Sequence, residues 1–459
     1  MVEIKKVLND SAMIRWLVLI IVSISMAANY YFYDALSPLK QYMGEHLGFS
    51  SADYGRFISA YSFPNVFLLM AVLGGIITDR LGIRITGTTF VALMVFGSFF
   101  TAYGASEYYN NGGPGYAFLD SFAHGWSPAL KMMFFGYFLF GLGAETSIVV
   151  ITKIVVKWFK GKEMALALGV NLAIARLGAA MSLIVTPALV EPSWTSPIWF
   201  GMLLLSIGFL FFVSYLFFDR KLDKQRLIDV SEKEVFRISD IGKLLTNRSF
   251  IFITLLCVTF YSAVFPFIKY APDLLQNKFG LSMTLSSTMT SMVYFGTIIF
   301  TPIFGWIADK RGKSATMMIF GSLLLILVHL TLSLTRVTPF IPMFFLGIAF
   351  SLIPATMWPS VAKIVDEPRL GTAYGLMFSI QNIGLWAFPI LIGTVLDKSN
   401  PGVTADLVAK GEAVYNYTNP VLMLAVLGLF GLVFAFLLKR EDKTSGYGLE
   451  LPNKQDSAV

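Results

Sequence analysis

Twelve long apolar runs constrain the fold of this 459-residue chain more than any other feature. A helix needs about 20 apolar residues to cross the ~30 Å hydrocarbon core of a bilayer. The runs lie at about 14–34, 55–78, 84–104, 132–157, 164–189, 198–218, 250–271, 286–308, 315–334, 340–364, 371–396 and 418–438. A transmembrane β-barrel would show alternating segments of ~10 residues instead. We therefore expect an all-α membrane protein with twelve transmembrane helices.

The composition agrees and excludes other classes. Hydrophobic residues make up 56% of the chain and charged residues 14%, whereas soluble domains have nearer ~25% charged residues. Disorder, collagen and a disulfide-stapled scaffold are excluded. Cys257 is the single cysteine and the three histidines, His46, His124 and His329, are well separated. We expect no disulfide, no metal site and no cofactor.

The basic residues predict the orientation in the membrane. An even number of spans places both termini on one side. If that side is cytoplasmic, 25 of the 35 Lys and Arg residues lie on it and eight lie outside, which follows the positive-inside rule. The net charge of +7 therefore reflects topology and predicts no nucleic-acid partner. Below, "inner" denotes the end that carries both termini and "outer" the opposite end.

The chain contains an internal repeat. GGIITDRLGIR at 74–84 recurs as FGWIADKRGK at 304–313, and Gly141 matches Gly347 at an offset of 206. Corresponding spans lie six apart and run in the same direction, which predicts two six-helix bundles related by a parallel repeat. The expected domains are an N-terminal bundle (1–218), a cytoplasmic linker (219–249), a C-terminal bundle (250–440) and a cytoplasmic tail (441–459).

The two repeated loops resemble the signature of the major facilitator superfamily. The matching positions are Gly75, Asp79, Arg80, Gly82 and Arg84 in the first copy, and Gly305, Asp309, Lys310, Gly312 and Lys313 in the second. The resemblance implies the major facilitator fold and assigns these residues to gating. The glycines would permit tight turns and close helix contact, and the charges near helix ends would lock or release the inner gate.

Several other stretches resemble the branch of this superfamily that contains a lysosomal dipeptide uniporter. They include FGLGAETSI, VKWFKGKEMALALGVNLAIARLG, AVFPFI, MWPSVA and LGTAYGLMFSIQNIGL, and they are spread over five spans. In that branch a Glu on span four and an Arg on span five hold the two ends of a dipeptide. The resemblance therefore implies that Glu145 and Arg176 bind substrate.

Helix geometry places these two residues at one depth. Glu145 is 13 residues from the inner end of span four, and Arg176 is 13 residues from the start of span five. At ~1.5 Å per residue both lie ~20 Å from the inner boundary. Charges at this depth are costly and need partners or water. The two side chains would either bind the ends of a zwitterion or form a permanent interhelical ion pair.

The second half carries neutral groups at the repeat-related positions, Ser351 and Asn382. We therefore expect the first bundle to bind the charged ends of the substrate. The second bundle would tolerate varied side chains through Tyr261, Phe265, Tyr294, Trp358, Gln381 and Asn382.

Other polar residues in the spans have two interpretations each. Tyr30, Tyr31, Tyr33 and Asp34 form either an aromatic belt beside a hydrated carboxylate or a cavity wall. Tyr61 and Asn65 flank Pro64 and would face the cavity, unless the proline only bends the helix. Lys153 is expected to extend to the headgroups, and His329 to lie in the core or against lipid rather than in a proton relay. Tyr137 occupies a position where many proton-coupled relatives have Arg, which argues against proton coupling.

The function that fits best is alternating-access transport of dipeptides or similar small zwitterions, without coupling to an ion. The alternative is a proton- or ion-coupled carrier of another small organic solute, such as an organic anion, sugar or drug. A nutrient sensor lacks the soluble domains for signalling, and no catalytic cluster predicts an enzyme. Expected partners are the substrate and membrane lipid, and nothing in the chain implies an accessory subunit. We expect a bacterial inner membrane with both termini cytoplasmic.

Overall fold

The computed structural model describes residues 7–225 and 238–452, and all regular structure within them is helical. Most of the predicted linker and the last residues of the predicted tail lie outside these ranges. The first group of elements is η1 (Leu8–Asp10), α1 (Ala12–Ala35), η2 (Ser37–Leu39), α2 (Lys40–Leu47), α3 (Ser51–Ser59), α4 (Phe63–Phe67), α5 (Met70–Ala105), α6 (Glu107–Asn110), α7 (Tyr116–Asp120), α8 (Pro128–Phe159), α9 (Met164–Leu189) and α10 (Ser196–Gln225).

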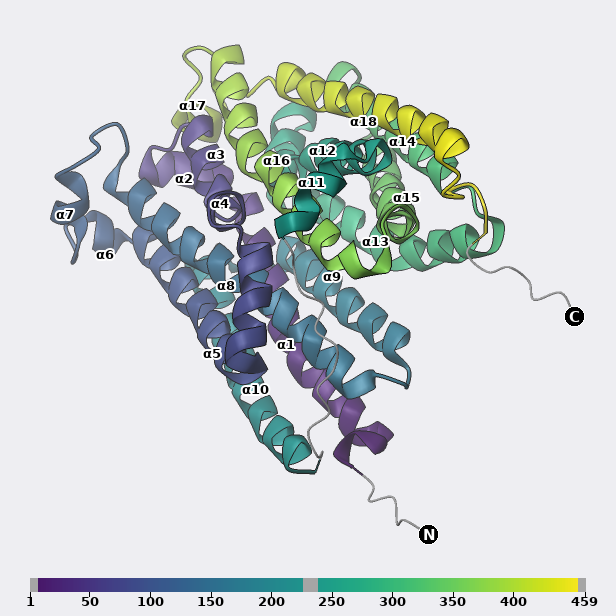
Figure 1. Ribbon diagram of the computed structural model, residues 1–459. Coiled ribbons are helices and arrows are strands. Elements are labelled where there is room, and N and C mark those ends of the chain that lie inside the picture. The colour runs from purple at the N-terminus through teal and green to yellow at the C-terminus, as the bar shows by residue number, and fades with distance from the viewer. Residues whose placement is uncertain (1–6, 226–237, 453–459) are drawn as a thin grey trace, which may run out of the picture.

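The second group is α11 (Ile238–Thr246), α12 (Arg248–Phe279), α13 (Met283–Arg311), α14 (Ser314–Leu334), α15 (Phe340–Ile364), η3 (Glu367–Arg369), α16 (Leu370–Ser399), α17 (Ala405–Ala409) and α18 (Thr418–Ser445). Helices α1, α5, α8, α9 and α10 pack on one another, as do α12, α13, α14, α15, α16 and α18. Figure 1 shows these as two bundles. The prediction of an all-α membrane fold is confirmed.

Eleven helices in the described residues are long and apolar enough to cross a membrane. The twelfth predicted span, 55–78, is broken into α3, α4 and the start of α5. Pro64 opens α4, and Leu69 adopts a left-handed conformation at φ 52° before α5. The helix assignment then continues through the predicted loop into span three, although Gly82 has non-helical angles of φ 83° and ψ 160°. The predicted second span therefore exists as an interrupted helix.

The two bundles meet at their outer ends. Helix α3 lies beside α16 (Figure 1). The Asp397 carboxylate of α16 accepts hydrogen bonds from the backbone N–H of Ser51 (3.0 Å) and of Ala52 (2.8 Å), the first residues of α3. A Cβ on Gly393 would lie 2.0 Å from the Ser51 carbonyl oxygen. A side chain at this position would therefore separate the bundles.

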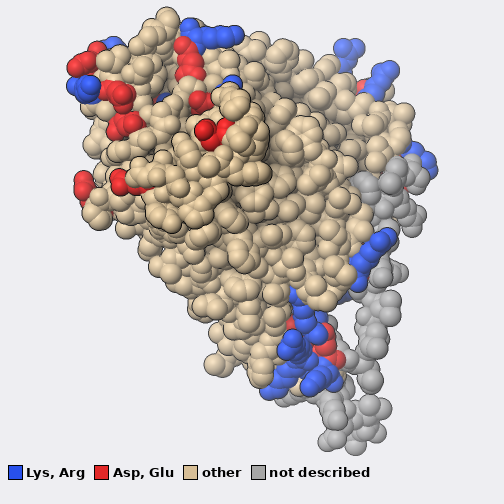
Figure 2. Space-filling model, turned by 90° about the vertical axis from the view of Figure 1, so that its left-hand side faces the viewer, with Lys and Arg blue, Asp and Glu red and all other residues tan. Residues whose placement is uncertain are grey.

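The inner ends differ from the outer ends. A Cβ added to Gly75, Gly169 or Gly305 would meet no atom within 4 Å, so these small positions of the two repeats make no close contact. Charged side chains gather toward the upper and lower parts of the face in Figure 2, and the broad region between them carries few charged residues. The outer ends of the bundles are therefore in close contact, whereas these three glycines make no such contact at the inner ends.

Candidate functional site

Arg176 lies on α9 inside a ring of aromatic side chains. Its guanidinium carbon is 5.0 Å from the centroid of Phe350, 5.7 Å from Tyr30, 5.8 Å from Tyr294 and 5.9 Å from Phe265. Tyr30 comes from α1, and the other three come from the second bundle. Ring faces attract a cation, so the rings hold the guanidinium between the bundles without using its hydrogen-bond donors.

One of these donors is available to a ligand. The Nη1 atom of Arg176 is buried and has no hydrogen-bond partner among the described residues. A buried donor without a partner is costly, and a guanidinium accommodates a carboxylate in a bidentate geometry. The arrangement is therefore suited to an anionic group that enters the aromatic ring.

Glu145 lies on α8 next to different neighbours. The Tyr61 hydroxyl lies close enough to the Glu145 carboxylate to influence the carboxylate's charge. Asn65 lies on the other side of the Pro64 break, and its side-chain nitrogen and oxygen have no hydrogen-bond partner among the described residues. No salt bridge within 4.0 Å joins Glu145 to Arg176 in the described part of the chain. The alternative of a permanent interhelical ion pair is therefore not observed. Tyr30 contributes its ring to the surroundings of Arg176, 5.7 Å from the guanidinium carbon.

The second bundle supplies an aromatic wall. Trp358 donates an indole hydrogen bond to the Tyr261 hydroxyl (3.0 Å) and stacks on Phe378 with ring centroids 4.7 Å apart. Tyr261 stacks on Phe265 at 5.6 Å. The two predicted polar residues, Gln381 and Asn382, are less available to a ligand. The Gln381 side-chain oxygen accepts a hydrogen bond from the Cys257 thiol (3.3 Å). The predicted residues of the second bundle therefore come together mainly as apolar surface.

Asn382 is buried on α16, and its amide nitrogen donates to the Phe378 carbonyl (3.0 Å). The Asn382 side-chain oxygen has no hydrogen-bond partner in the described residues. The Asn382 oxygen could therefore accept a hydrogen bond from a ligand, whereas the amide nitrogen already donates to a carbonyl of its own helix.

A buried charge network lies on the outer side of Arg176, and the sequence did not predict it. The Lys269 ammonium of α12 lies 2.7 Å from the Asp34 carboxylate of α1, and their exposures are 1% and 0%. Tyr294 donates its hydroxyl to the same carboxylate (2.7 Å). The interpretation of Asp34 as a hydrated residue is wrong, because this carboxylate is fully enclosed between the bundles. The sequence did contain a signal for this ion pair, because Asp34 and Lys269 lie at the outer ends of their predicted spans.

Other candidates lie outside this site. Tyr31 packs its ring on Phe200 of α10 (5.8 Å), away from the second bundle. Tyr137 donates its hydroxyl to the Tyr33 carbonyl (3.1 Å), so it supports α1. His329 is fully buried and its Nδ1 lies 2.9 Å from the Leu325 carbonyl, which agrees with a core role.

Residues of the first copy of the repeated loop form three ion pairs, of which Arg84 makes two, with Asp219 and with Asp223. Lys153 reaches Asp79 (2.6 Å), so its ammonium bonds to this loop instead of extending to the headgroups as expected. Arg84 pairs with Asp219 (2.6 Å) at the end of α10. Arg80 is exposed. Each of these bonds stays within the first bundle.

The second copy is covered by the C-terminal tail. The backbone N–H of Lys313 donates to the Glu450 carbonyl (3.1 Å), and the Glu450 carboxylate accepts from the Thr316 N–H (2.8 Å). A Cβ on Gly312 would lie 2.5 Å from the Glu450 carbonyl oxygen. Lys310 lies over the Trp306 ring at 5.2 Å, and Asp309 is exposed. The tail contact was not predicted.

Comparisons with known proteins agree with this fold. The chain matches the sequence profile of the Major Facilitator Superfamily over residues 19–389 and 267–455. It is 31% identical over 398 residues to the lysosomal dipeptide transporter MFSD1 of Danio rerio, covering 83% of this chain and 81% of that protein. Identity to the human protein of that name is 30% over 396 residues, covering 84% and 80%. Identity to the hexuronate transporter of Bacillus subtilis is 24% over 409 residues, covering 84% and 89%.

Solved structures show the same architecture. The nucleoside transporter NupG aligns with a TM-score of 0.67 at 17% identity and covers 93% of this chain and 99% of its own. A D-xylose-proton symporter aligns with a TM-score of 0.66 at 14% identity, covering 93% and 97%. At these identities the likeness concerns the fold alone, and it confirms the predicted two-bundle architecture.

Proposed function

Because this chain belongs to the major facilitator superfamily and is a multi-pass membrane transporter rather than an enzyme, we propose that it moves dipeptides or similar small zwitterions. Transport proceeds by alternating access, and the protein acts as a uniporter. Arg176 binds the carboxylate end of the substrate and Glu145 binds its amino end. The proposal also places both termini in the cytoplasm of a bacterium, with the protein in the inner membrane.

The observation that carries this proposal is the unpaired Arg176 donor within its aromatic ring. Glu145 likewise has no basic partner within 4.0 Å among the described residues. Isolated charges in a membrane protein mark substrate or ion pathways. One cationic and one anionic group complement a zwitterion, and relatives covering most of the chain are named dipeptide transporters.

Uptake into liposomes that contain the purified protein tests the proposal. We expect saturable dipeptide uptake, competed by dipeptides with two free ends. Competitors that are acetylated at the amino end or amidated at the carboxyl end should be at least ~10-fold weaker, since each loses one charge-assisted hydrogen bond. Uptake of every dipeptide at the rate of protein-free liposomes would contradict the proposal.

Uniport is tested in the same liposomes. A uniporter equilibrates the dipeptide and does not concentrate it when a pH gradient is imposed, and the internal pH is unchanged by transport. Tyr137 in place of an arginine supports this mechanism. Concentrative uptake driven by the pH gradient would overturn it.

A second candidate function is the carriage of an organic anion. The Arg176 ring would accept any carboxylate, and the Bacillus subtilis relative is named a hexuronate transporter. Under this alternative Glu145→Gln leaves uptake unchanged, whereas Arg176→Ala abolishes it. Loss of uptake in both variants supports a zwitterion instead.

Orientation is tested by labelling single cysteines in intact cells, after replacing Cys257 by serine. Lys410→Cys lies in an exposed position at the outer end, and Lys443→Cys in an exposed position at the inner end. An impermeant maleimide should label only Lys410→Cys. The reverse pattern would place the termini outside.

A further inference from the structure

Two buried ion pairs of opposite polarity join the bundles on the outer side. Asp34 of the first bundle pairs with Lys269 of the second at 2.7 Å, whereas Lys40 of the first pairs with Asp273 of the second at 2.8 Å. All four side chains are at most 5% exposed. Separating the bundles here would leave each charge unpaired, so both pairs favour the closed outer side as long as they stay dry.

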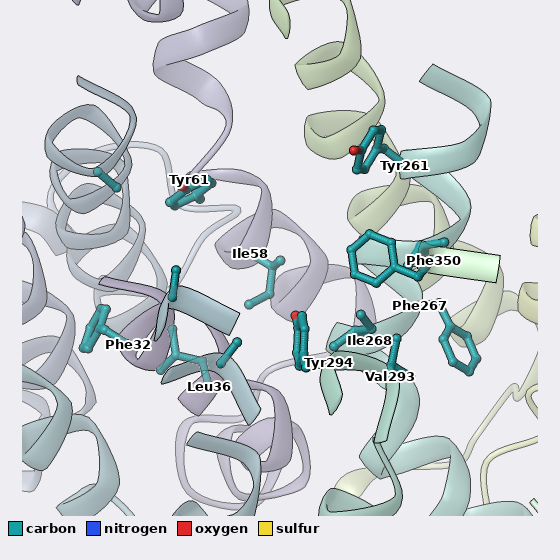
Figure 3. Packing of buried hydrophobic residues seen from close by; sticks show 14 of the residues in the cluster. Phe32, Leu36, Ile58, Tyr61, Tyr261, Phe267, Ile268, Val293, Tyr294 and Phe350 are labelled. Carbon is teal, nitrogen blue, oxygen red and sulfur yellow. The ribbon is translucent and has the colours of Figure 1, made fainter. Parts of the chain in front are cut away.

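Among the described residues, Tyr294 connects the Asp34–Lys269 pair, but not the Lys40–Asp273 pair, to the candidate site. The Tyr294 hydroxyl donates to Asp34 (2.7 Å), while its ring faces the Arg176 guanidinium at 5.8 Å. Figure 3 shows Tyr294 near Phe350, which belongs to the same aromatic ring around Arg176. A carboxylate that moves the guanidinium within this ring must therefore contact or move Tyr294.

The ion pair also connects to the Glu145 side of the site. The Lys269 ammonium lies 3.3 Å from the centroid of the Tyr33 ring, and Tyr33 packs edge-to-face on Tyr61 at 4.6 Å. Tyr61 in turn contacts Glu145. The same ion pair is thus reached from both charged ends of the site by chains of tyrosines.

We propose that the Asp34–Lys269 ion pair is the latch of the outer gate and that Tyr294 couples it to occupancy of Arg176. This inference rests on the proposed function. A substrate carboxylate on Arg176 fixes the Tyr294 ring, so its hydroxyl holds Asp34 in line with Lys269. The Lys40–Asp273 pair closes the same side, but it has no such link. Tyr294 is thus a positioning residue that converts binding into closure.

A cysteine in the space next to the latch reports whether the outer gate is open. Ser62 is 2% exposed and lines the small space that Tyr33, Phe265 and Lys269 also line. We would introduce Ser62→Cys into a protein that carries Cys257→Ser and label it with an impermeant maleimide from the outer side. In the otherwise unchanged protein we expect a dipeptide to reduce the labelling rate at least ~3-fold.

Tyr294→Phe retains the ring over Arg176 and removes only the hydroxyl. The dipeptide should still raise the thermal transition temperature of this variant, because the ring that faces Arg176 is retained. Its labelling rate should rise, and the dipeptide should no longer reduce it. Tyr417→Phe is the matched control, because the Tyr417 hydroxyl donates to Asp273 of the other pair. This control should retain protection by the dipeptide.

Three results would overturn the coupling. The first is that the dipeptide still protects Tyr294→Phe from labelling. The second is that Tyr294→Phe loses dipeptide binding as completely as Arg176→Ala does. The third is that Tyr417→Phe loses protection to the same extent as Tyr294→Phe.

The latch itself is tested without substrate, so its test is separate from that of the proposed function. Lys269→Ala should raise labelling, and the exchange of Asp34→Lys with Lys269→Asp should lower it again. Unchanged labelling in Lys269→Ala would contradict the latch even if no dipeptide binds.

Discussion

Glu145 on α8 and Ser351 on α15 occupy related positions in the repeat, yet their polar atoms have different partners. The Ser351 hydroxyl donates to the Gly347 carbonyl of its own helix (2.8 Å) and lies 3.1 Å from the Gly296 carbonyl of the neighbouring helix α13. The Glu145 carboxylate instead lies close to the Tyr61 hydroxyl across the helix interface. The second bundle satisfies its polar group internally, whereas the first keeps a charge that a ligand can use.

Arg176 and Asn382 show the same difference. The Asn382 amide donates to its own helix (3.0 Å), but Arg176 keeps an unpaired donor. Under the proposed function the two bundles would therefore divide substrate recognition, because the first offers charge and the second offers aromatic surface.

The largest effect is expected for Arg176. Arg176→Ala removes a guanidinium whose charged hydrogen bonds are each worth about 1.5–3 kcal/mol. A bidentate carboxylate contact would lose two of them, so the Kd for a dipeptide should rise at least ~100-fold. The matched change Asn382→Ala should raise it less than about 3-fold. Isothermal titration calorimetry measures both, and equal losses would remove the asymmetry between the bundles.

Glu145→Gln should have the next largest effect. The change preserves shape and removes the negative charge, so the Kd for a free dipeptide should rise about 10-fold. Binding of the same dipeptide acetylated at its amino end should change little. Ser351→Ala, the repeat-related control, should leave both values within about 2-fold. If Glu145→Gln lowered the affinity for both dipeptides equally, Glu145 would have a structural role and would not bind the amino end of the substrate.

Trp358 tests the aromatic side of the comparison. Trp358→Ala removes a ring that stacks on Phe378 at 4.7 Å and a hydrogen bond to Tyr261. Competition assays should show weaker binding, by about 3- to 10-fold, for dipeptides with large apolar side chains. Dialanine should be affected less. An equal loss for both dipeptides would indicate that the wall supports the fold without contacting the substrate side chain.

The sequence was sufficient for features that depend on local pattern. Apolar runs predicted the helices, and counting along α8 and α9 brought Glu145 and Arg176 to one level. The Asp34–Lys269 pair was not predictable in this way, because its partners are 235 positions apart and meet only when the outer ends close. The left-handed Leu69 was likewise missed, since neither its residue type nor its pattern indicates positive φ.

The smallest effect separates two glycines of the first repeated loop. Gly82 has φ 83° and ψ 160°, a region almost confined to glycine that costs other residues about 1–3 kcal/mol, so Gly82→Ala should destabilise the protein by about that amount. The methyl group of Gly75→Ala would meet no atom within 4 Å in this structure, so this change should leave thermal stability unchanged. If the inner ends close during transport, Gly75→Ala should still slow dipeptide uptake, because its added methyl group obstructs only the other state. Stability in detergent and uptake in liposomes distinguish these effects, and normal uptake in Gly75→Ala would exclude Gly75 from the inner gate.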